Sequence, residues 1–100
     1  MATFSIEVSV SAAREIEVLR PFDRGQVIDA IARNLRTEPT AVTKRRNLLH
    51  GARPRFEHVP PVWQLRVGAI RVFYDVDEEK RIVWIRAVRM KGRRTTQEIL

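Results

Sequence analysis

The sequence predicts an α+β domain in which an N-terminal strand and two helices precede a three-stranded antiparallel meander, with the helices packed on one face of the sheet. Three observations predict this order. Apolar residues alternate with polar ones near the N-terminus, recur every three or four positions in the next third, and alternate again in three runs separated by short turns. A chain of 100 residues has the length of one domain, so residues 1–100 are expected to form a single domain.

The first strand is predicted from Phe4 to Val10, where every second residue is apolar. Ser11 can accept a hydrogen bond from the backbone at the start of a short helix. That helix is expected to run to about Leu19 and to stop at Pro21, because proline cannot continue a helix.

The second helix is predicted to begin near Asp23, because Gln26 follows three residues later in the pattern of a capping box. Its apolar stripe has the spacing of one helical face, and the helix should end before Pro39. The stripe consists of Val27, Ile28, Ile31, Ala32 and Leu35. Residues 44–61 hold three prolines and a glycine without clear periodicity, which predicts a helical turn followed by an irregular loop.

Three strands are predicted at residues 62–67, 70–76 and 82–89. Their connections, at residues 68–69 and 77–80, are too short for anything but antiparallel pairing. The last residues, 95–100, carry a weak capping box and are expected to form a helical turn or to fray.

These turns also predict which side chains lie opposite one another. Arg66 should face Arg71, and Arg71 should face Arg86, which places three arginines in one row. Gln64, Phe73 and Trp84 fall on the same face. The opposite, apolar face should meet the helices and consists of Leu65, Val67, Ile70, Val72, Tyr74, Val83, Ile85 and Ala87.

Like charges that lie opposite each other destabilise a sheet, so the arginine row is interpreted as a binding site for an anion. A guanidinium group can donate two parallel hydrogen bonds to one phosphate. Phe73 and Trp84 offer flat surfaces for bases or for a partner chain. The structural alternative is that each arginine pairs with an acidic neighbour such as Asp75 or points to water, while the aromatic rings fill a small core.

The charge of the chain favours polyanionic partners. Nineteen Lys and Arg residues against twelve Asp and Glu residues give a formal net charge of +7, which attracts nucleic acid or an acidic protein. One basic cluster lies at residues 86–94. The second consists of Lys44, Arg45, Arg46, Arg53 and Arg55.

Other classes of function are disfavoured. The chain has no cysteine, and its two histidines, His50 and His58, have no carboxylate cluster near them in the sequence, so neither a metal nor a cofactor is expected. It has no apolar run of about 20 residues and no secretory signal pattern. We therefore expect a cytoplasmic location and no membrane partner.

The run from Trp63 to Val76, WQLRVGAIRVFYDV, resembles the central motif of the RelE/ParE superfamily of bacterial toxins. The opening strand, the two helices, the basic stretch ending in Leu48-Leu49-His50-Gly51 and the basic tail at residues 86–94 follow in the order typical of that family. The resemblance implies the toxin of a type II toxin–antitoxin module, held inactive by a cognate antitoxin. RelE-like members cut messenger RNA in the ribosomal A site, whereas ParE-like members poison DNA gyrase.

Carried over onto this sequence, the resemblance implies catalytic roles for Arg66, Arg71 and Lys91. Basic side chains of this kind stabilise the charge that develops on a phosphate. The remaining candidates, for contacts with nucleic acid, are Lys44, Arg45, Arg46, Arg86, Arg89, Arg93, Arg94, Phe73 and Trp84.

The sequence departs from the family at residues that bear on cleavage. Val62 and Gln64 stand where active ribosome-dependent members have lysines, and Gln97 stands where a functional tyrosine is expected. Tyr74 lies on the predicted apolar face and is interpreted as a core residue. His50 and His58 titrate near neutral pH and are candidates for proton transfer, although an ordinary role in a surface loop is the simpler interpretation.

Three functions therefore remain open. The first is a RelE-like, ribosome-dependent mRNA endoribonuclease that uses no metal. The second is a ParE-like toxin that inhibits DNA gyrase without cleaving, and the third is an inactive relative that only binds nucleic acid. Under either toxin hypothesis, an antitoxin should lay an acidic amphipathic segment over the apolar strips beside the helices and neutralise the arginines.

Overall fold

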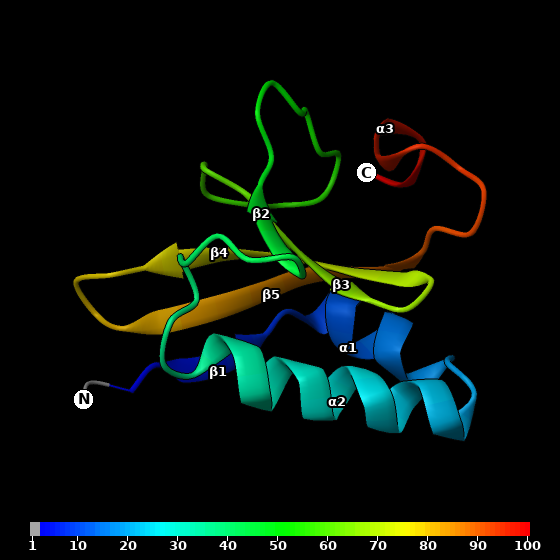
Figure 1. Ribbon diagram of the computed structural model, residues 1–100, viewed down its shortest axis with the longest axis horizontal. Helices are drawn as coiled ribbons and strands as arrows, with labels where there is room; N and C mark the ends of the chain where they lie inside the picture. The colour runs from blue at the N-terminus through cyan, green and yellow to red at the C-terminus, as the bar shows by residue number, and fades with distance from the viewer. Residues whose placement is uncertain (1–2) are drawn as a thin grey trace.

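Residues 3–100, which the computed structural model describes, form a five-stranded mixed sheet in the order β1-β5-β4-β3-β2 and three helices (Figure 1). Helices α1 and α2 cover one face of the sheet, and α3 lies over the other. The elements are β1 Ser5–Val8, α1 Val10–Glu17, α2 Pro21–Leu35, β2 Arg46–Leu48, β3 Trp63–Val67, β4 Ile70–Asp77, β5 Ile82–Met90 and α3 Thr96–Ile99. Within this range, no helix combines the length and the apolar character needed to cross a membrane.

The predicted α+β order is confirmed, but the N-terminal strand is shorter than predicted. β1 ends at Val8, and Ser9, rather than Ser11, caps α1 by accepting a hydrogen bond of 3.1 Å from the backbone N–H of Ala12. β1 runs parallel to β5, with Ser5 beside Ile82 and Val8 beside Ile85. The parallel pairing of these two strands makes the sheet mixed.

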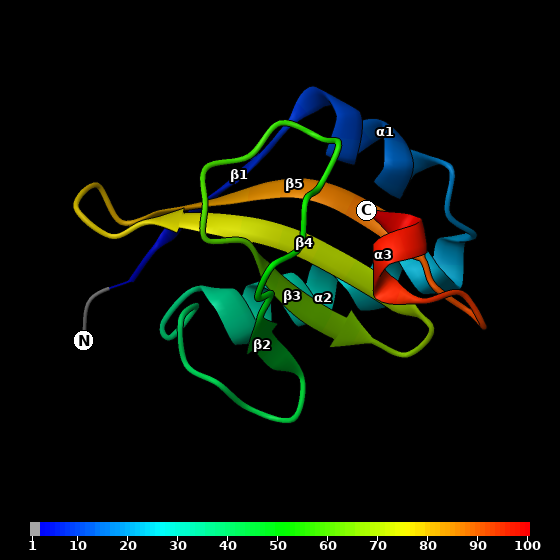
Figure 2. The same ribbon diagram turned by 90° about the horizontal axis from the view of Figure 1, so that it is seen from above.

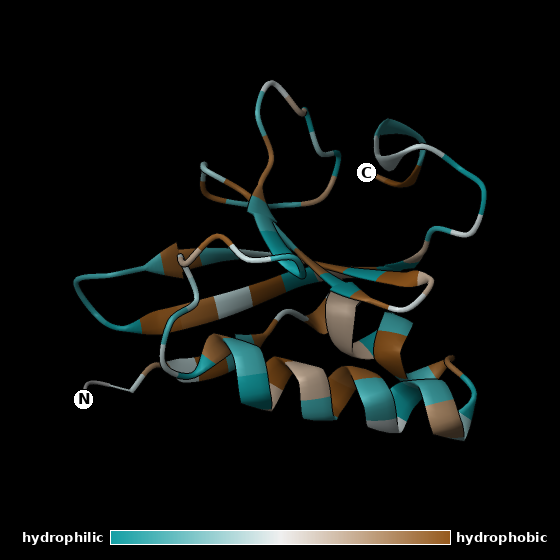
Figure 3. Ribbon diagram, viewed as in Figure 1, coloured by the Kyte–Doolittle hydropathy of each residue, from teal (hydrophilic) through white to brown (hydrophobic). Residues whose placement is uncertain are grey.

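Helix α2 begins at Pro21, the residue that was expected only to stop the preceding helix. Proline is well tolerated in the first turn of a helix, because the N–H that it lacks would have no partner there. The predicted apolar stripe is confirmed at Val27, Ile31 and Leu35, which are all buried. Figure 3 shows apolar bands recurring along α2 between polar ones.

The main core lies between these two helices and the sheet. The α2 stripe packs against apolar side chains of β3, β4 and β5, which were predicted to face the helices; they are Leu65, Ile70, Val72, Tyr74, Val83 and Ile85. Fully burying a side chain of this size contributes roughly 1.5–3 kcal/mol. This cluster therefore holds the layers together.

Strand β2 was not predicted, since a helical turn was expected there. Arg46 lies opposite Leu65 and Leu48 lies opposite Trp63, so the strand extends the sheet beyond β3. The Arg46 guanidinium is buried and donates hydrogen bonds to the backbone carbonyls of Asn34 and Glu38. A strand of three residues is too short to show an alternating pattern. Its buried residue is an arginine, a type that sequence patterns assign to the surface.

The β3–β4 hairpin has the predicted register, with Arg66 opposite Arg71 and Val67 opposite Ile70. Gly68 has a φ of +59°, which a type II′ turn requires at its first central residue.

The register between β4 and β5 differs from the prediction. Val76 lies opposite Val83, and an irregularity at Phe73 and Tyr74 leaves Arg86 as an extra residue on β5. The two-residue shift at the β4–β5 turn and this one-residue bulge together place Arg71 opposite Arg89 rather than Arg86. The bulge also turns Ala87 away from the helices, where it was expected, onto the opposite face.

A second apolar cluster covers that opposite face. Figure 2 shows the loop of residues 49–61, called the covering loop, and α3 crossing over β4 and β5. The cluster consists of Val62, Phe73, Ala87, Ile99 and Leu100, with Leu49, Ala52 and Phe56 packed against it. Phe73 is completely buried there, so it is a core residue and not the exposed platform for bases that was expected.

The single tyrosine, Tyr74, is completely buried in the main core, which confirms its interpretation as a core residue. Its hydroxyl donates a hydrogen bond of 2.6 Å to the backbone carbonyl of Pro39. Burial raises the pKa of Tyr74 above its usual value, and the positive charge of Arg46 only partly opposes this shift.

We expect Tyr74 to stay protonated at pH 11 in the folded chain, whereas a tyrosine with an ordinary pKa of about 10 would be largely ionised. Tyrosinate absorbance near 295 nm measures this directly, and the chain unfolded in guanidinium chloride is the control. Because the pKa is raised on folding, this contribution to stability is complete below about pH 10 and is lost as the pH rises further. Ionisation of the folded chain near pH 10 would contradict the prediction.

Candidate nucleic-acid interface

A row of three arginines crosses the sheet on the face opposite α1 and α2. Arg66, Arg71 and Arg89 lie side by side on β3, β4 and β5. The row was predicted, but its third member is Arg89 instead of Arg86, because the β4–β5 turn shifts the register by two residues and the bulge on β5 shifts it by one more. The three side chains differ in exposure: Arg66 is exposed, Arg71 is 7% exposed and Arg89 is half-buried.

Arg71 is a buried cation without an anionic partner. Its Nη1 donates hydrogen bonds to the backbone carbonyls of Gly68, at 2.7 Å, and of Ile70, at 3.0 Å. Burial lowers the pKa of Arg71, and the nearby charge of Arg66 lowers it further. Among residues 3–100, no carboxylate lies within ion-pairing distance of it. An anion bound beside Arg71 would therefore offset an electrostatic cost that the fold leaves uncompensated.

Lys91 lies next to this arginine pair. Its backbone N–H donates a hydrogen bond of 2.8 Å to the carbonyl of Ala69, in the β3–β4 turn. Three predicted catalytic residues, Arg66, Arg71 and Lys91, thus meet at one end of the sheet, and we call them the hairpin site. Arg93 and Arg94 follow in the exposed segment after β5, where Arg94 donates a hydrogen bond to the carbonyl of Met90.

Arg89 is occupied by contacts within the chain. It forms an ion pair with Glu15 of α1 at 2.7 Å, and its Nη1 donates a 3.2 Å hydrogen bond to the carbonyl of Ile99 in α3. Its guanidinium also lies 5.8 Å from the ring centre of Phe56 in the covering loop. Arg89 therefore joins α1, α3 and the covering loop, and it has less freedom to bind phosphate than the hairpin site.

Arg86 is also engaged, as the structural alternative for these arginines anticipated. Its Nε and Nη2 donate to the two carboxylate oxygens of Asp75 at 2.7 and 3.3 Å, and its guanidinium lies 5.0 Å from the ring centre of Trp84. Asp75 is 3% exposed and also accepts a 2.9 Å hydrogen bond from the backbone N–H of Val59. Arg86 and Asp75 thus anchor the covering loop, and Arg86 shields a face of the Trp84 ring from bases.

The second basic cluster is divided by the fold. Lys44 and Arg45 are exposed before β2, but Arg46 is 8% exposed and holds β2 against the end of α2. Arg46 is therefore a structural residue, contrary to its predicted role in binding nucleic acid.

The residues that depart from the family pattern offer no exposed proton-transfer group on the strands. Val62 and Gln64 are buried, and Gln64 donates to the side-chain oxygen of Asn47 at 3.2 Å. Gln97 is exposed in α3. His58 is half-buried in the covering loop, with its Nδ1 2.9 Å from the carbonyl oxygen of Phe56, and His50 is exposed.

The sequence analysis did not identify the anchoring role of Glu15. Its Oε1 accepts a 3.0 Å hydrogen bond from the backbone N–H of Val88, while its Oε2 pairs with Arg89. Glu15 was not singled out in the sequence, because no sequence signal links it to β5.

Comparison with solved structures identifies the fold. No protein-family model matches the sequence, and no curated protein shows significant sequence similarity to it. The chain is similar to one in the toxin–antitoxin complex RelBE2 from Mycobacterium tuberculosis, with a TM-score of 0.64, 20% identity and coverage of 89% of this chain and 99% of that one.

It is also similar to a chain of the archaeal RelE–RelB complex from Pyrococcus horikoshii, with a TM-score of 0.71, 18% identity and coverage of 91% of this chain and 98% of that one. This chain therefore has the same fold as the matched chain in each of these two complexes, as the sequence resemblance predicted.

We expect Asp75→Asn to release the covering loop and to destabilise the domain by about 3 kcal/mol, because it leaves the buried Arg86 guanidinium with only the exposed Glu57, 3.7 Å away, as a counter-ion. Chemical denaturation measures the free energy of unfolding, and trypsin should cut faster after Arg55 in the loop. The control is Glu79→Gln, which removes an exposed acid from the β4–β5 turn. Unchanged stability and cleavage would show that the ion pair does not hold the loop.

Proposed function

We propose that this chain is the toxin of a type II toxin–antitoxin pair and acts as a RelE-like, ribosome-dependent mRNA endoribonuclease. The observation that carries the proposal is the hairpin site, where the buried guanidinium of Arg71 has no carboxylate partner and lies beside the exposed Arg66, while the backbone of the half-buried Lys91 binds the turn that joins their strands. The fold shared with RelE-type complexes supports it, as does the net charge of +7.

The chemistry that suits this site is charge stabilisation at a phosphodiester. The 2′-oxygen of a ribose attacks the adjacent phosphorus, the bond from phosphorus to the 5′-oxygen breaks, and the products are a 2′,3′-cyclic phosphate and a free 5′-hydroxyl. Negative charge increases on the phosphoryl oxygens in the transition state, and fixed cations stabilise it there. Arg71 is held in place by Gly68 and Ile70, so little reorganisation is needed when that charge develops.

Proton transfer in this proposal runs through solvent. Tyr74 and Gln64 are buried, and the hairpin site itself consists of two arginines and a lysine. Arginine does not deprotonate under ordinary conditions, so it acts as a charge and a hydrogen-bond donor instead of a base. Water takes the proton of the 2′-hydroxyl and returns one to the 5′-oxygen.

The test is cleavage of a defined messenger RNA in a purified translating system, mapped by primer extension. Wild-type protein should cut only when ribosomes are present, and Arg71→Gln should reduce the cleavage rate by about 10²-fold, the effect of removing one donor to developing charge. Arg66→Gln, at an exposed position, should also reduce it without disturbing the core. Arg55→Gln removes the same charge from the covering loop and should leave cleavage near the wild-type rate. Intact message at high protein concentration would overturn the proposal.

A second candidate is a ParE-like toxin that inhibits DNA gyrase without cleaving. The observation that favours it is the burial of Val62, Gln64 and Tyr74, which leaves no exposed proton-transfer group at these three strand positions. Inhibition of supercoiling by purified gyrase, together with intact messenger RNA, would identify this function. A protein that affects neither assay but binds RNA with steep salt dependence would be the inactive relative.

The partner in either case is an antitoxin with an acidic amphipathic segment. An apolar hollow of about 180 Å³ lies between β1 and the two large helices, lined by Ile6, Val8, Ile16, Ile28, Ile31 and Ala32, with Arg36 beside them. Ile28 is 54% exposed and Val8 is 40% exposed. An apolar helical stripe with a carboxylate placed to meet Arg36 would cover these side chains, as the sequence analysis predicted for the strips beside the helices.

A further inference from the structure

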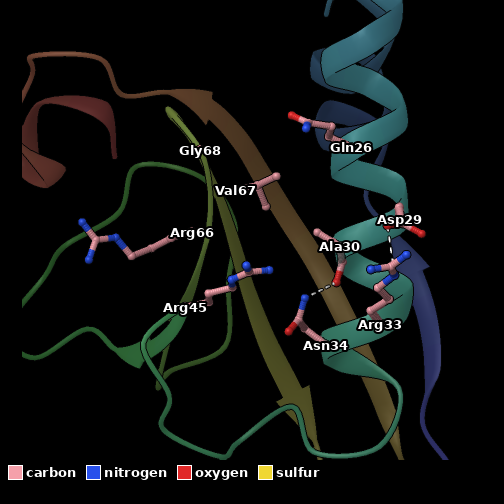
Figure 4. Close-up of a pocket in the computed structure, with 9 residues that line it drawn as sticks. All are labelled: Gln26, Asp29, Ala30, Arg33, Asn34, Arg45, Arg66, Val67 and Gly68. Carbon is pink, nitrogen blue, oxygen red and sulfur yellow. Dashed lines mark hydrogen bonds and ion pairs between the residues drawn. The ribbon is translucent and has the colours of Figure 1, made fainter.

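A hollow of about 310 Å³ lies between α2 and the β3–β4 turn, and we call it the edge hollow (Figure 4). Its lining includes Arg66 of the hairpin site, together with Arg45 and Arg33. β2 pairs with β3 up to Leu65, so the last part of β3 before the turn lies at an edge of the sheet. The edge hollow therefore continues the hairpin site around this edge.

Two of the arginines at the edge hollow lack a carboxylate partner. Arg45 and Arg66 are both exposed, and among residues 3–100 no carboxylate lies within ion-pairing distance of either. Arg33 forms an ion pair with Asp29 at 3.1 Å, so these two charges largely cancel. The hollow thus carries two uncompensated positive charges, which favours a ligand with more than one anionic group.

These two arginines start from neighbouring backbone but extend to different sides. The backbone N–H of Arg66 donates a 2.7 Å hydrogen bond to the carbonyl of Arg45. Figure 4 shows Arg45 extending toward α2 and Arg66 extending away from it. A ligand that contacts both guanidinium groups must therefore bend over the edge of β3. A single RNA strand can bend in this way and follow a basic groove, whereas a double helix stays nearly straight over so short a distance.

A side-chain amide lies at the Arg45 end of the hollow. Arg46, the next residue, donates a hydrogen bond to the backbone carbonyl of Asn34, whose side chain lines the hollow. The Nδ2 of Asn34 donates a 2.7 Å hydrogen bond to the carbonyl of Ala30, which fixes the amide so that its Oδ1 is presented as an acceptor. Adenine, cytosine and guanine carry an exocyclic amino group that can donate to such an oxygen, whereas uracil has none.

We propose that single-stranded RNA runs from the hairpin site over the edge of β3 into the edge hollow, where Arg45 binds a backbone phosphate and Asn34 accepts a hydrogen bond from the amino group of a base. The inference rests on the proposed function, because it takes RNA as the substrate. It adds that the substrate is unpaired and that one position of it disfavours uracil.

The first measurement is the affinity for fluorescent hexa-adenylate, protected by 2′-O-methyl groups so that the 2′-oxygen cannot attack. Arg45→Gln should weaken binding about tenfold, the effect of losing one charge-assisted hydrogen bond. It should also reduce the slope of log affinity against log salt concentration by about 0.7, the value for one phosphate contact with a single strand.

The matched control is Arg81→Gln, which removes an exposed arginine from the β4–β5 turn. It should change the affinity by less than about twofold, because salt screens a charge that lies far from the bound strand. Equal effects of the two substitutions would overturn the proposal, since they would show only a general loss of charge.

Protected hexa-uridylate, which has the same backbone, tests the contact with the base. Wild-type protein should bind hexa-adenylate more tightly than hexa-uridylate, and Asn34→Ala should reduce the ratio of the two affinities about threefold, as expected when one neutral hydrogen bond is lost. Differences in stacking between the two bases are present with both proteins and cancel in this comparison. An unchanged ratio would overturn the proposal.

Nuclear magnetic resonance locates the bound strand. In ¹⁵N-labelled protein, protected hexa-adenylate should shift the side-chain amide signals of Asn34. Hexaglutamate is the probe for an acidic protein segment, and a stable RNA duplex is the probe for paired RNA. The proposal is overturned if either of them shifts these signals as strongly as hexa-adenylate does, or if hexa-adenylate leaves them unmoved.

These outcomes are distinguishable from those of the proposed function, because the binding assays contain neither a ribosome nor a strand that can be cut. Binding that depends on Arg45 and Asn34, in a protein that cuts no message, would keep the edge hollow and reject the nuclease. Cleavage that depends on Arg71, in a protein whose affinity for hexa-adenylate is unchanged by Arg45→Gln, would keep the nuclease and reject the edge hollow.

Discussion

The fold depends on β4 being buried on both of its faces. Residues 70–75 are all buried, with Val72 and Tyr74 against the helices and Phe73 under the covering loop and α3. A sheet covered on both sides needs two apolar clusters, and a chain of 100 residues has few apolar side chains to spare for the second. The ion pair between Asp75 and Arg86 completes that second layer, because it fixes the covering loop through the backbone of Val59.

The same burial explains the character of the basic residues. Arginines that have partners hold the structure together: Arg46 binds backbone carbonyls, Arg86 binds Asp75, and Arg89 binds Glu15. Arg71 is enclosed by the same layers, and like Arg46 it has only carbonyl partners. The two differ in what they reach, because Arg46 joins β2 to the end of α2 whereas Arg71 binds only carbonyls of its own hairpin, and composition alone does not reveal this difference.

Local patterns in the sequence predicted those features that depend on neighbouring residues. The α2 stripe and the Gly68 turn are local, so the helix core and the pairing of Arg66 with Arg71 were predicted correctly. The bulge at Arg86 was not predicted. It lies where β5 pairs with β1 and β4 and where Arg86 binds Asp75, and these contacts join segments far apart in sequence. Strand β2 and the burial of Phe73 were missed for the same reason, because each depends on segments distant in sequence.

The β3–β4 turn positions the hairpin site. The carbonyl of Gly68 accepts a hydrogen bond from the Arg71 guanidinium, and the carbonyl of Ala69 accepts one from the backbone N–H of Lys91. Since Gly68 has a φ of +59°, a conformation that other residues adopt only with strain, this turn has little freedom to vary. The hairpin site is therefore held by a rigid turn, and Arg66 and Gly68 also line the hollow between this turn and α2 (Figure 4).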